Sequence, residues 1–388
     1  VLILAGGAAA AETAIGRALA SAPLSWLGRI SYPLYLWHWP LMVLGAVLVP
    51  TISPWGRLAW GVFAIIPAYL SQRLIERPLH SRIAAWVSGP EQFMYAVGVS
   101  LALTLTAHWA ALRSTRHIER SAHRTFAAAR ADRMEHSCWA RSADQAPRAS
   151  CAFGDKNSDM RLALLGDSHA EHWLGGLDRA GKARGWRIDA NVMGGCPVSD
   201  FSRLISGSTA RRYRECSRYR EATLQRIIAQ RPTAVILSSF DSYMGIEGGE
   251  RHEYQVTESA WREGLRRTYA RLAAARIPVI VLRGTPRVPF DVPSCLSRRA
   301  ERLPFASDCQ FTIDRAFRAR AQLAQDVAAR GLNVRFVDMN DQVCATTRCP
   351  TIRDGVVMFT DDNHLTAGFT KSVGLVLADR LSGALGAH

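Results

Sequence analysis

The pattern of apolar and polar positions divides the chain into two unlike parts. Up to about residue 112, three long apolar runs follow one another, at residues 33–50, 58–72 and 93–112, and Trp and Tyr lie near their ends. A helix needs about 20 apolar residues to cross a bilayer, and aromatic residues gather at the membrane interfaces. We therefore expect three transmembrane helices, with buried core helices of a soluble domain as the alternative.

Arginines in the short loops predict how these spans are oriented. Only Arg57 lies between the first two runs, whereas the other two loops hold Arg17, Arg29, Arg73, Arg77 and Arg82. Cytoplasmic loops carry an excess of Lys and Arg. We therefore expect residues 11–30 and 73–92 in the cytoplasm and everything after about residue 113 outside it. Residues 1–10 look like the tail of an earlier span, so we also expect the sequence to start inside a larger membrane domain.

After residue 157 the pattern changes to short apolar runs that alternate with helix-length stretches. The strand candidates are 161–165, 187–193, 233–238, 277–282 and 333–338, and the helix candidates are 169–184, 208–230, 256–275, 312–331 and 366–384. Such an alternation predicts an α/β domain with a parallel sheet covered on both faces. Residues 113–157, rich in Arg and Ala, are expected to form a helical or irregular connector between the two parts.

Net charge changes this picture little. The formal charge of +15 at first favours a nucleic-acid partner, but 45 of the 48 basic residues are arginines scattered among alanines, and only Lys156, Lys182 and Lys371 are lysines. Compositional bias explains this distribution better than a binding groove does, so no nucleic acid is expected as a partner. A role of the basic charge at a membrane surface or on an acidic glycan stays open.

The cysteines bear on the compartment. All eight follow the apolar part, and they fall into close pairs, Cys138 and Cys151, Cys196 and Cys216, Cys295 and Cys309, Cys344 and Cys349. An even count without a C-x-x-C spacing predicts disulfides in an oxidising compartment rather than a zinc ribbon. We expect neighbours to pair; eight buried free thiols are the alternative. No cluster at metal-ligand spacing is evident, so no metal is expected.

Two short motifs carry candidate chemistry. Residues 166–169 read Gly-Asp-Ser-His directly after the first strand of the α/β part, and residues 361–364 read D-x-x-H just before its last helix. A serine hydroxyl becomes a nucleophile when a base accepts its proton and a third group orients that base. Ser168, His364 and Asp361 could fill these roles, with Asp362 as a competing partner of His364. His169 and His172 are expected to be helix-face or substrate-side residues.

These motifs resemble those of the SGNH, or GDSL-like, esterase family, over about residues 158–388. The resemblance implies a three-layer α/β fold with Ser168 as nucleophile, His364 as general base and Asp361 as its partner. The family also uses a Gly after the second strand and an Asn after the third as oxyanion donors. Residues 193–197 offer Gly194 and Gly195, of which we favour Gly195. No Asn follows the third strand, where Ser239 or Asp241 stands instead, so Ser239 is our candidate there and the third donor is in doubt.

The apolar part resembles a second family. Residues 27–41, LGRISYPLYLWHWPL, and residues 74–80, LIERPLH, are similar to the end of acyltransferase-3 membrane proteins, some of which carry an extra span and a periplasmic SGNH domain. This implies a membrane-domain fragment at 1–92, an additional span at 93–112, the connector at 113–157 and the catalytic domain at 158–388. His38 lies inside the first span, where a neutral, satisfied imidazole is favoured over a functional one.

The combined resemblance implies an O-acyltransferase of the bacterial inner membrane with a periplasmic C-terminal domain. It would acetylate a surface polysaccharide such as lipopolysaccharide O-antigen or peptidoglycan through an acyl-serine intermediate. Acetyl-CoA would be the ultimate donor, no cofactor would be tightly bound, and the partners would be membrane lipid and the preceding membrane helices of the same protein. A carbohydrate acetyl-esterase and a non-catalytic glycan-binding module are the alternatives.

Overall fold

The computed structural model of the 388-residue chain describes residues 13–48, 53–78, 90–120, 123–133, 138–140, 151–201, 210–245, 256–302 and 307–386. The expected tail of an earlier span, residues 1–10, and the sequence after Pro78 up to residue 89 lie outside the described residues. Contacts between Cα atoms divide the chain into two compact units, with the boundary between Arg120 and Ser121. Each unit is described by itself.

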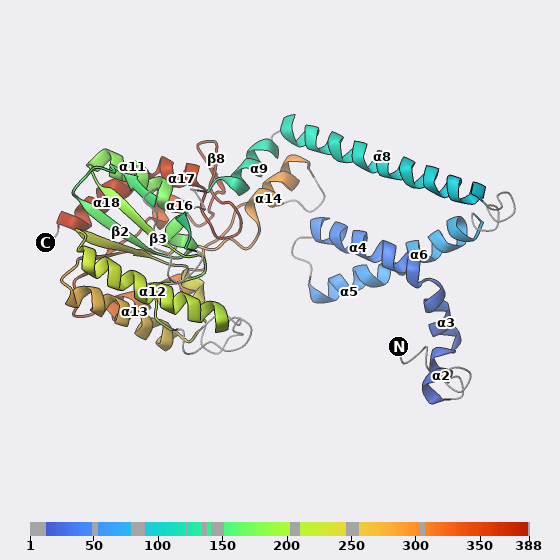
Figure 1. The fold of residues 1–388 in the computed structure, drawn as a ribbon, viewed down its shortest axis with the longest axis horizontal. Helices are drawn as coiled ribbons and strands as arrows, with labels where there is room; N and C mark the ends of the chain where they lie inside the picture. The colour runs from blue at the N-terminus through green and yellow to red at the C-terminus, as the bar shows by residue number, and fades with distance from the viewer. Residues whose placement is uncertain are drawn as a thin grey trace. The chain divides into compact units, whose positions relative to one another are not determined.

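The first unit is helical. Its elements are α2 (Ala14–Leu19), α3 (Ala22–Arg29), α4 (Ser31–Leu48), α5 (Pro54–Phe63), α6 (Ile65–Ser71), the π-helical segment η1 (Gln72–Glu76) and α8 (Pro90–Arg120) (Figure 1). α4 packs against α5 and α6. A Cβ atom on Gly45 would lie 2.8 Å from the Trp60 indole, so a glycine there lets α4 approach α5 closely.

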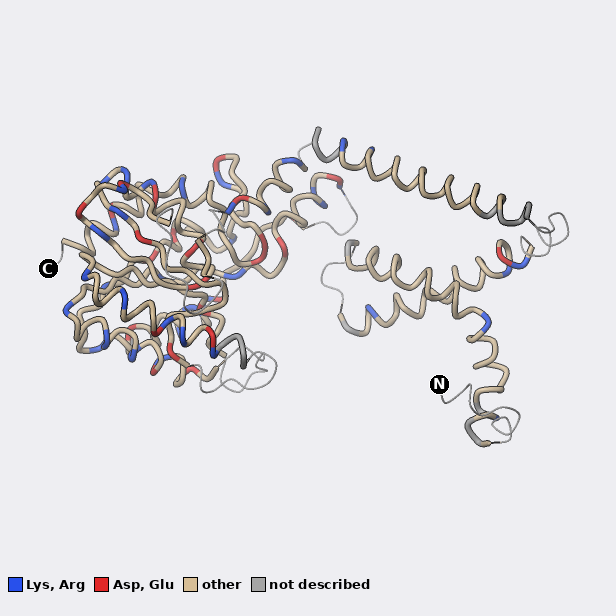
Figure 2. The backbone as a smooth tube through the Cα atoms, viewed as in Figure 1, with Lys and Arg blue, Asp and Glu red and all other residues tan. Residues whose placement is uncertain are grey.

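This unit exposes much apolar surface. Charged residues are few along α4 to α6 and the middle of α8, whereas they are spread over the second unit (Figure 2). Trp55 is 79% exposed and Tyr35 is 70% exposed. Within the described residues, Trp55–Glu76 alone is long and apolar enough to cross a membrane on length and composition, and it contains the second expected span. The other two expected spans fall on the helices α4 and α8. Neither of these helices meets the same criterion of length and hydropathy.

The second unit is built on a six-stranded sheet with the strand order β1-β3-β2-β4-β5-β6. Its strands are β1 (Ala152–Gly154), β2 (Arg161–Gly166), β3 (Arg187–Val192), β4 (Ala234–Ser238), β5 (Val279–Leu282) and β6 (Val334–Val337). All neighbours pair in parallel except β1, which runs antiparallel to β3. The expected α/β fold with a parallel sheet is confirmed, and every strand candidate forms a strand.

Helices cover both faces of this sheet (Figure 1). The helices of the second unit are α9 (His123–Ala131), α10 (Ser168–Glu171), α11 (Leu174–Arg184), α12 (Ala210–Gln230), α13 (Glu258–Ala274), α14 (Val292–Ala300), α15 (Arg315–Ala329), α16 (Asn340–Val343), α17 (Ala367–Ser372) and α18 (Gly374–Gly386), of which α9 and α14 pack against each other beside the sheet. Successive residues of β2 point to opposite faces. Leu162 and Leu164 pack with α11 and α18, whereas Ala163 and Leu165 pack with α12, α13 and α15.

The four disulfides of the second unit join the neighbouring cysteines, as expected from the sequence. They are Cys138–Cys151, Cys196–Cys216, Cys295–Cys309 and Cys344–Cys349, and no cysteine is free. Two further short strands, β7 (Ile352–Arg353) and β8 (Val356–Val357), form a hairpin before the D-x-x-H segment. Each disulfide constrains the loop that it closes.

Candidate active site

Ser168 is the first residue of α10, directly after the turn at Asp167 that follows β2. Asp167 is the N-cap of α10, and its Oδ1 accepts a hydrogen bond of 2.8 Å from the amide of His169. The other carboxylate oxygen, Oδ2, accepts from the amide of Phe240 at 3.0 Å, which ties this turn to the end of β4. Because carboxyl ends of parallel strands meet at one edge of the sheet, this is where such domains build their sites.

The segment before α17 brings His364 and Asp361 to the same edge. Ser168 Oγ lies 2.8 Å from His364 Nε2, and His364 Nδ1 lies 2.7 Å from Asp361 Oδ2. Asp361 Oδ1 accepts from the amides of Asn363 at 2.9 Å and His364 at 2.8 Å. An ionised Asp361 requires Nδ1 to carry the ring proton, so Nε2 is free to accept the proton of Ser168.

Asp361 is held in its ionised form. Burial alone would raise its pKa, but the hydrogen bonds from the His364 ring and from the two backbone amides outweigh burial and hold the pKa well below its ordinary value. Arg133 adds a further donor, since its Nη2 lies 2.8 Å from Asp361 Oδ2. The arrangement can therefore orient the imidazole and stabilise the positive charge that the ring gains when it takes a proton.

Comparison with known families decides the affiliation of this unit. Residues 137–378 match the family model described as the SGNH domain fused to AT3 domains. The chain belongs to this SGNH-domain family. A curated relative is “Putative peptidoglycan O-acetyltransferase YrhL” of Bacillus subtilis (strain 168), 36% identical over 70 residues. That match covers 18% of this chain and 11% of the relative, so the chain spans only a small part of the relative's length.

Solved structures with low sequence identity resemble the chain. The periplasmic domain of a lipopolysaccharide acetyltransferase from Salmonella ser. Paratyphi A is 15% identical, with a TM-score of 0.45 over 59% of this chain and 84% of that chain. A lipase/acylhydrolase from Enterococcus faecalis is 12% identical, with a TM-score of 0.35 over 57% of this chain and 95% of that chain.

Two buried histidines line the SGNH site without joining the hydrogen-bonded series. His169 stacks on Phe240 and has its ring centroid 5.0 Å from that of His364, and its Nε2 and Nδ1 face Asn363 Oδ1 at 3.1 Å and Thr285 Oγ1 at 3.4 Å. Burial, followed by the proximity of His364, lowers the pKa of His169 to about 3. Burial also holds the pKa of His172 well below its ordinary value. Both rings are therefore neutral and serve as packing against the catalytic candidates.

Burial disfavours the ionised form of three carboxyl groups near the SGNH site. Burial raises the pKa of Asp167 to about 6, of Glu171 to about 7 and of Asp241 to about 7. Asp241 begins the 3-10 turn after β4, and its Oδ1 accepts from the side-chain amide of Gln325 at 3.0 Å. Asp241 therefore has a carboxyl group that changes its charge near neutral pH.

The loop after β3 holds the residues predicted as oxyanion donors. Gly195 has a φ of 69°, a left-handed conformation that favours glycine, and a Cβ on Gly194 would lie 2.8 Å from the Trp139 ring. Ser239 Oγ accepts from the amide of Val198 at 2.9 Å, so this buried hydroxyl fastens the β3 loop to the end of β4. Its proton can still be donated elsewhere, and the oxyanion roles of Gly195 and Ser239 stay predictions.

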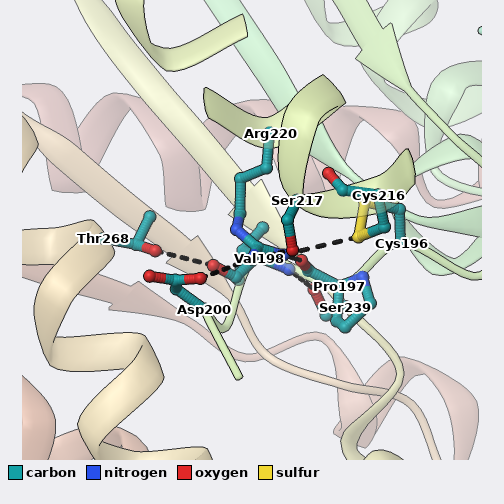
Figure 3. Close-up of a disulfide and its surroundings, with 9 residues drawn as sticks. All are labelled: Cys196, Pro197, Val198, Asp200, Cys216, Ser217, Arg220, Ser239 and Thr268. Atoms are coloured by element: carbon teal, nitrogen blue, oxygen red, sulfur yellow. Dashed lines mark hydrogen bonds and ion pairs between the residues drawn. A yellow bond between two sulfur atoms is a disulfide. The ribbon is translucent and has the colours of Figure 1, made fainter. Parts of the chain in front are cut away.

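A disulfide and an ion pair made by a buried arginine fix this loop (Figure 3). Cys196 follows Gly195 and is bonded to Cys216 of α12. One turn further along α12, the guanidinium of Arg220 is nearly buried, donates to the carbonyl of Pro197 at 3.1 Å and pairs with Asp200 at 2.6 Å. Thr268 of α13 donates to the carbonyl of Val198 at 2.7 Å. The backbone after Gly195 is thus anchored from two helices.

Several residues of this site were missed in the sequence analysis. Arg133 follows α9 in the segment interpreted as a connector, and Thr285 follows β5, where no functional signal was noted. Asn363 lies inside the D-x-x-H motif, which could have pointed to it. His38, in the helical unit, has its Nδ1 2.7 Å from the carbonyl of Tyr35, in keeping with a satisfied imidazole. Among the described residues, no group of His, Cys, Asp or Glu gathers as a metal site.

Proposed function

We propose that the chain is part of an O-acyltransferase that places acetyl groups on a bacterial surface polysaccharide, with the SGNH domain forming an acyl-Ser168 intermediate. The observation that carries this proposal is the continuous hydrogen-bonded series from Ser168 through His364 to Asp361. Membership of a family whose SGNH domains are fused to AT3 domains supports an acyl transfer. The relative named a peptidoglycan O-acetyltransferase supports a glycan as the acceptor.

In the first half of the proposed reaction, Ser168 Oγ attacks the carbonyl carbon of the acyl donor while His364 Nε2 accepts the hydroxyl proton. Asp361 holds the ring with Nδ1 protonated and stabilises the imidazolium. The bond between the acyl carbon and the donor's leaving oxygen or sulfur then breaks, and His364 returns the proton to that leaving group. The product is an ester of Ser168.

In the second half, a sugar hydroxyl attacks the ester carbon and gives its proton to His364 Nε2. The bond between the acyl carbon and Ser168 Oγ breaks, Oγ takes the proton back, and the sugar leaves as its ester. The backbone amide of Ser168, with Gly195 and Ser239, is proposed to stabilise the oxyanion of both steps. Each such donor can lower the barrier by about 3 kcal/mol.

The proposed placement of the domain is outside the cytoplasm. Pairing of all eight cysteines supports an oxidising compartment, because cytosolic thiols are kept reduced. The apolar stretch Trp55–Glu76 supports attachment to a membrane by the first unit. Acetyl-CoA would supply the acetyl group on the cytoplasmic side, and further membrane helices would carry it across to Ser168.

A Ser168→Ala variant tests the function in the intact protein. Polysaccharide isolated from cells that make the variant is expected to lack the ester-linked acetyl groups present with the wild type, as measured by mass spectrometry. Equal acetylation by variant and wild type would refute the acyl-serine mechanism. If the wild-type chain only hydrolyses an activated acetyl ester, at every acceptor concentration, the SGNH domain is an esterase. Lack of labelling of Ser168 by a serine-reactive probe would favour a glycan-binding module.

A further inference from the structure

A large cavity lies beside the SGNH site, over the carboxyl ends of β4 and β5. Its volume is about 850 Å³, within the range of small-molecule sites. Its lining comes from the end of β4, the loop after β5 and the start of α15. Its lining includes Asp241, Thr285, Arg287, Thr312, Phe317 and Arg318.

The cavity and the proposed catalytic residues share a wall. The amide of Val288 donates to the carbonyl of Asp362 at 2.7 Å, and the amide of Val292 donates to the carbonyl of Asp361 at 3.4 Å. Thr285 Oγ1 lies 3.4 Å from Nδ1 of His169, the residue after Ser168. A ligand in the cavity would therefore lie against the two loops that hold the catalytic candidates.

The volume indicates which reactant belongs there. An acetyl group has two carbon atoms and needs only a small part of about 850 Å³. One or more sugar rings would use the space far better. The cavity also lies on the β5 side of Ser168, whereas the loop that carries Gly195, one of the proposed oxyanion donors, follows β3 on the other side of β2. An acceptor in the cavity could approach the ester carbon without displacing that loop.

The lining matches the surface of a sugar. Phe290 and Phe317 are among its lining residues, and aromatic rings can pack against the apolar C–H face of a sugar ring; Thr285, Thr312 and Ser242 add hydroxyl groups to the lining. Asp241, whose pKa burial raises to about 7, can accept or donate hydrogen bonds near neutral pH. Polar groups set among apolar ones are the usual means by which a pocket orients a neutral ligand.

The charged groups of the lining already have partners, so an anionic ligand finds no free cation among the lining residues. Arg287 is held by Asp362 at 2.9 Å and Arg318 by Asp338 at 2.7 Å. Of the other lining carboxyl groups, Asp291 pairs with Arg130 and Asp314 caps α15. A uronic acid or a phosphorylated sugar would have to break an existing ion pair to gain a cationic partner.

We infer that this cavity binds a neutral, hydroxyl-rich segment of the acceptor polysaccharide and presents one of its hydroxyl groups to the acyl-serine. The inference rests on the proposed function for the role of the sugar as acceptor. Binding itself can be measured without any reaction, so the two ideas can fail separately.

The binding test uses the full chain in detergent with Ser168→Ala, and calorimetry measures the Kd for each sugar. The neutral ligands are tetrasaccharides of glucose, of rhamnose and of N-acetylglucosamine. The anionic ligand is a tetrasaccharide of galacturonic acid. At least one neutral sugar is expected to bind, and the anionic one more weakly. Thr312→Trp fills the cavity from an exposed position and is expected to raise the Kd at least about tenfold. Thr347→Trp, at an exposed position outside the lining, is the matched control.

The reaction test uses the same two tryptophan variants with intact Ser168 and an activated acetyl ester. In the presence of the best-bound sugar, the ratio of transfer to hydrolysis is expected to fall at least about tenfold in Thr312→Trp and to stay at the wild-type value in Thr347→Trp. The inference would be wrong if no neutral sugar bound, if the galacturonic acid tetrasaccharide bound best, or if Thr312→Trp changed neither the Kd nor the ratio of transfer to hydrolysis. If the wild-type protein bound sugar in the cavity but Ser168 never became acylated, the proposed function would be wrong instead.

Discussion

Arg133 and His364 share one oxygen of Asp361. The Nη2 atom of Arg133 lies 2.8 Å from Asp361 Oδ2, and the Nδ1 atom of His364 lies 2.7 Å from the same oxygen. Arg133 follows α9, and its neighbour Asp132 accepts hydrogen bonds from the amides of Ala367 and Gly368 at the start of α17. The segment before the SGNH sheet is therefore part of the support of the site.

This sharing gives Arg133 a positioning role that Arg133→Gln would reveal. The guanidinium donates to the carboxylate oxygen of Asp361 that faces Nδ1 of His364, so its loss removes one of the donors that hold this carboxylate against the ring. The kcat for hydrolysis of an activated ester is expected to fall about tenfold. Arg133→Lys, which keeps a cationic donor, is the control and should restore part of that kcat. A lower melting temperature with an unchanged kcat would reduce Arg133 to a structural role.

Asp361→Asn tests which of two neighbouring carboxylates orients His364. An amide nitrogen in place of Oδ2 cannot accept from Nδ1, so the ring loses its required tautomer, and kcat for ester hydrolysis is expected to fall about 10³–10⁴-fold. Asp362 points its carboxylate to Arg287 instead. Asp362→Asn should therefore cost at least about tenfold less in kcat than Asp361→Asn. Similar losses in the two variants would show that the observed pairing does not govern turnover.

Much of this architecture could be predicted from the sequence because it depends on local patterns. The apolar residues of β2 run directly into Asp167 and Ser168, and an Asp three residues before His364 on one turn is within reach of its ring. β1 is only three residues long, so its strand conformation depends on pairing with β3 rather than on its own pattern. The contact of Arg133 with Asp361 joins positions far apart in the chain, so no local spacing of residues predicts it.

The third oxyanion donor shows a different limit of sequence reasoning. Ser239 was predicted from its place after β4 in a position where the resembling family has an Asn. In the structure its Oγ accepts from Val198, while the adjacent Phe240 amide is bound by Asp167. A hydroxyl can accept one bond and donate another, so the sequence position fixes neither its partner nor its direction.

Removal of the Cys196–Cys216 disulfide is expected to lower both stability and turnover. The bridge closes a loop with a sequence separation of 20, against 5 for Cys344–Cys349. In the chain-entropy description, the paired Cys→Ala changes cost about 3 kcal/mol and about 2 kcal/mol of unfolding free energy, respectively. Urea unfolding measures this difference. At temperatures where both variants are folded, kcat is expected to fall only when the bridge next to Gly195 is lost; an equal effect of the two bridges on kcat would contradict a positioning role.

Asp241→Asn is expected to change how stability depends on pH. Burial raises the pKa of Asp241 to about 7, from 3.8 in the unfolded chain, with Arg283 opposing and Asp167 and Asp338 reinforcing the shift. Between about pH 4 and 7 the folded state therefore binds more protons than the unfolded state, so its stability falls as the pH rises and levels off above 7. A shift of this size corresponds to at most about 4 kcal/mol of unfolding free energy.

Asn cannot ionise and keeps an oxygen for the Gln325 amide, so the urea midpoint of the variant should fall less between pH 5 and 8 than that of the wild type. Asp167 and Glu171 also have raised pKa values, so part of the slope will remain. Asp379→Asn, at an exposed position of α18, is the matched control and should keep the wild-type slope; a slope in Asp241→Asn equal to that of this control would mean that Asp241 is solvated and ionised at neutral pH.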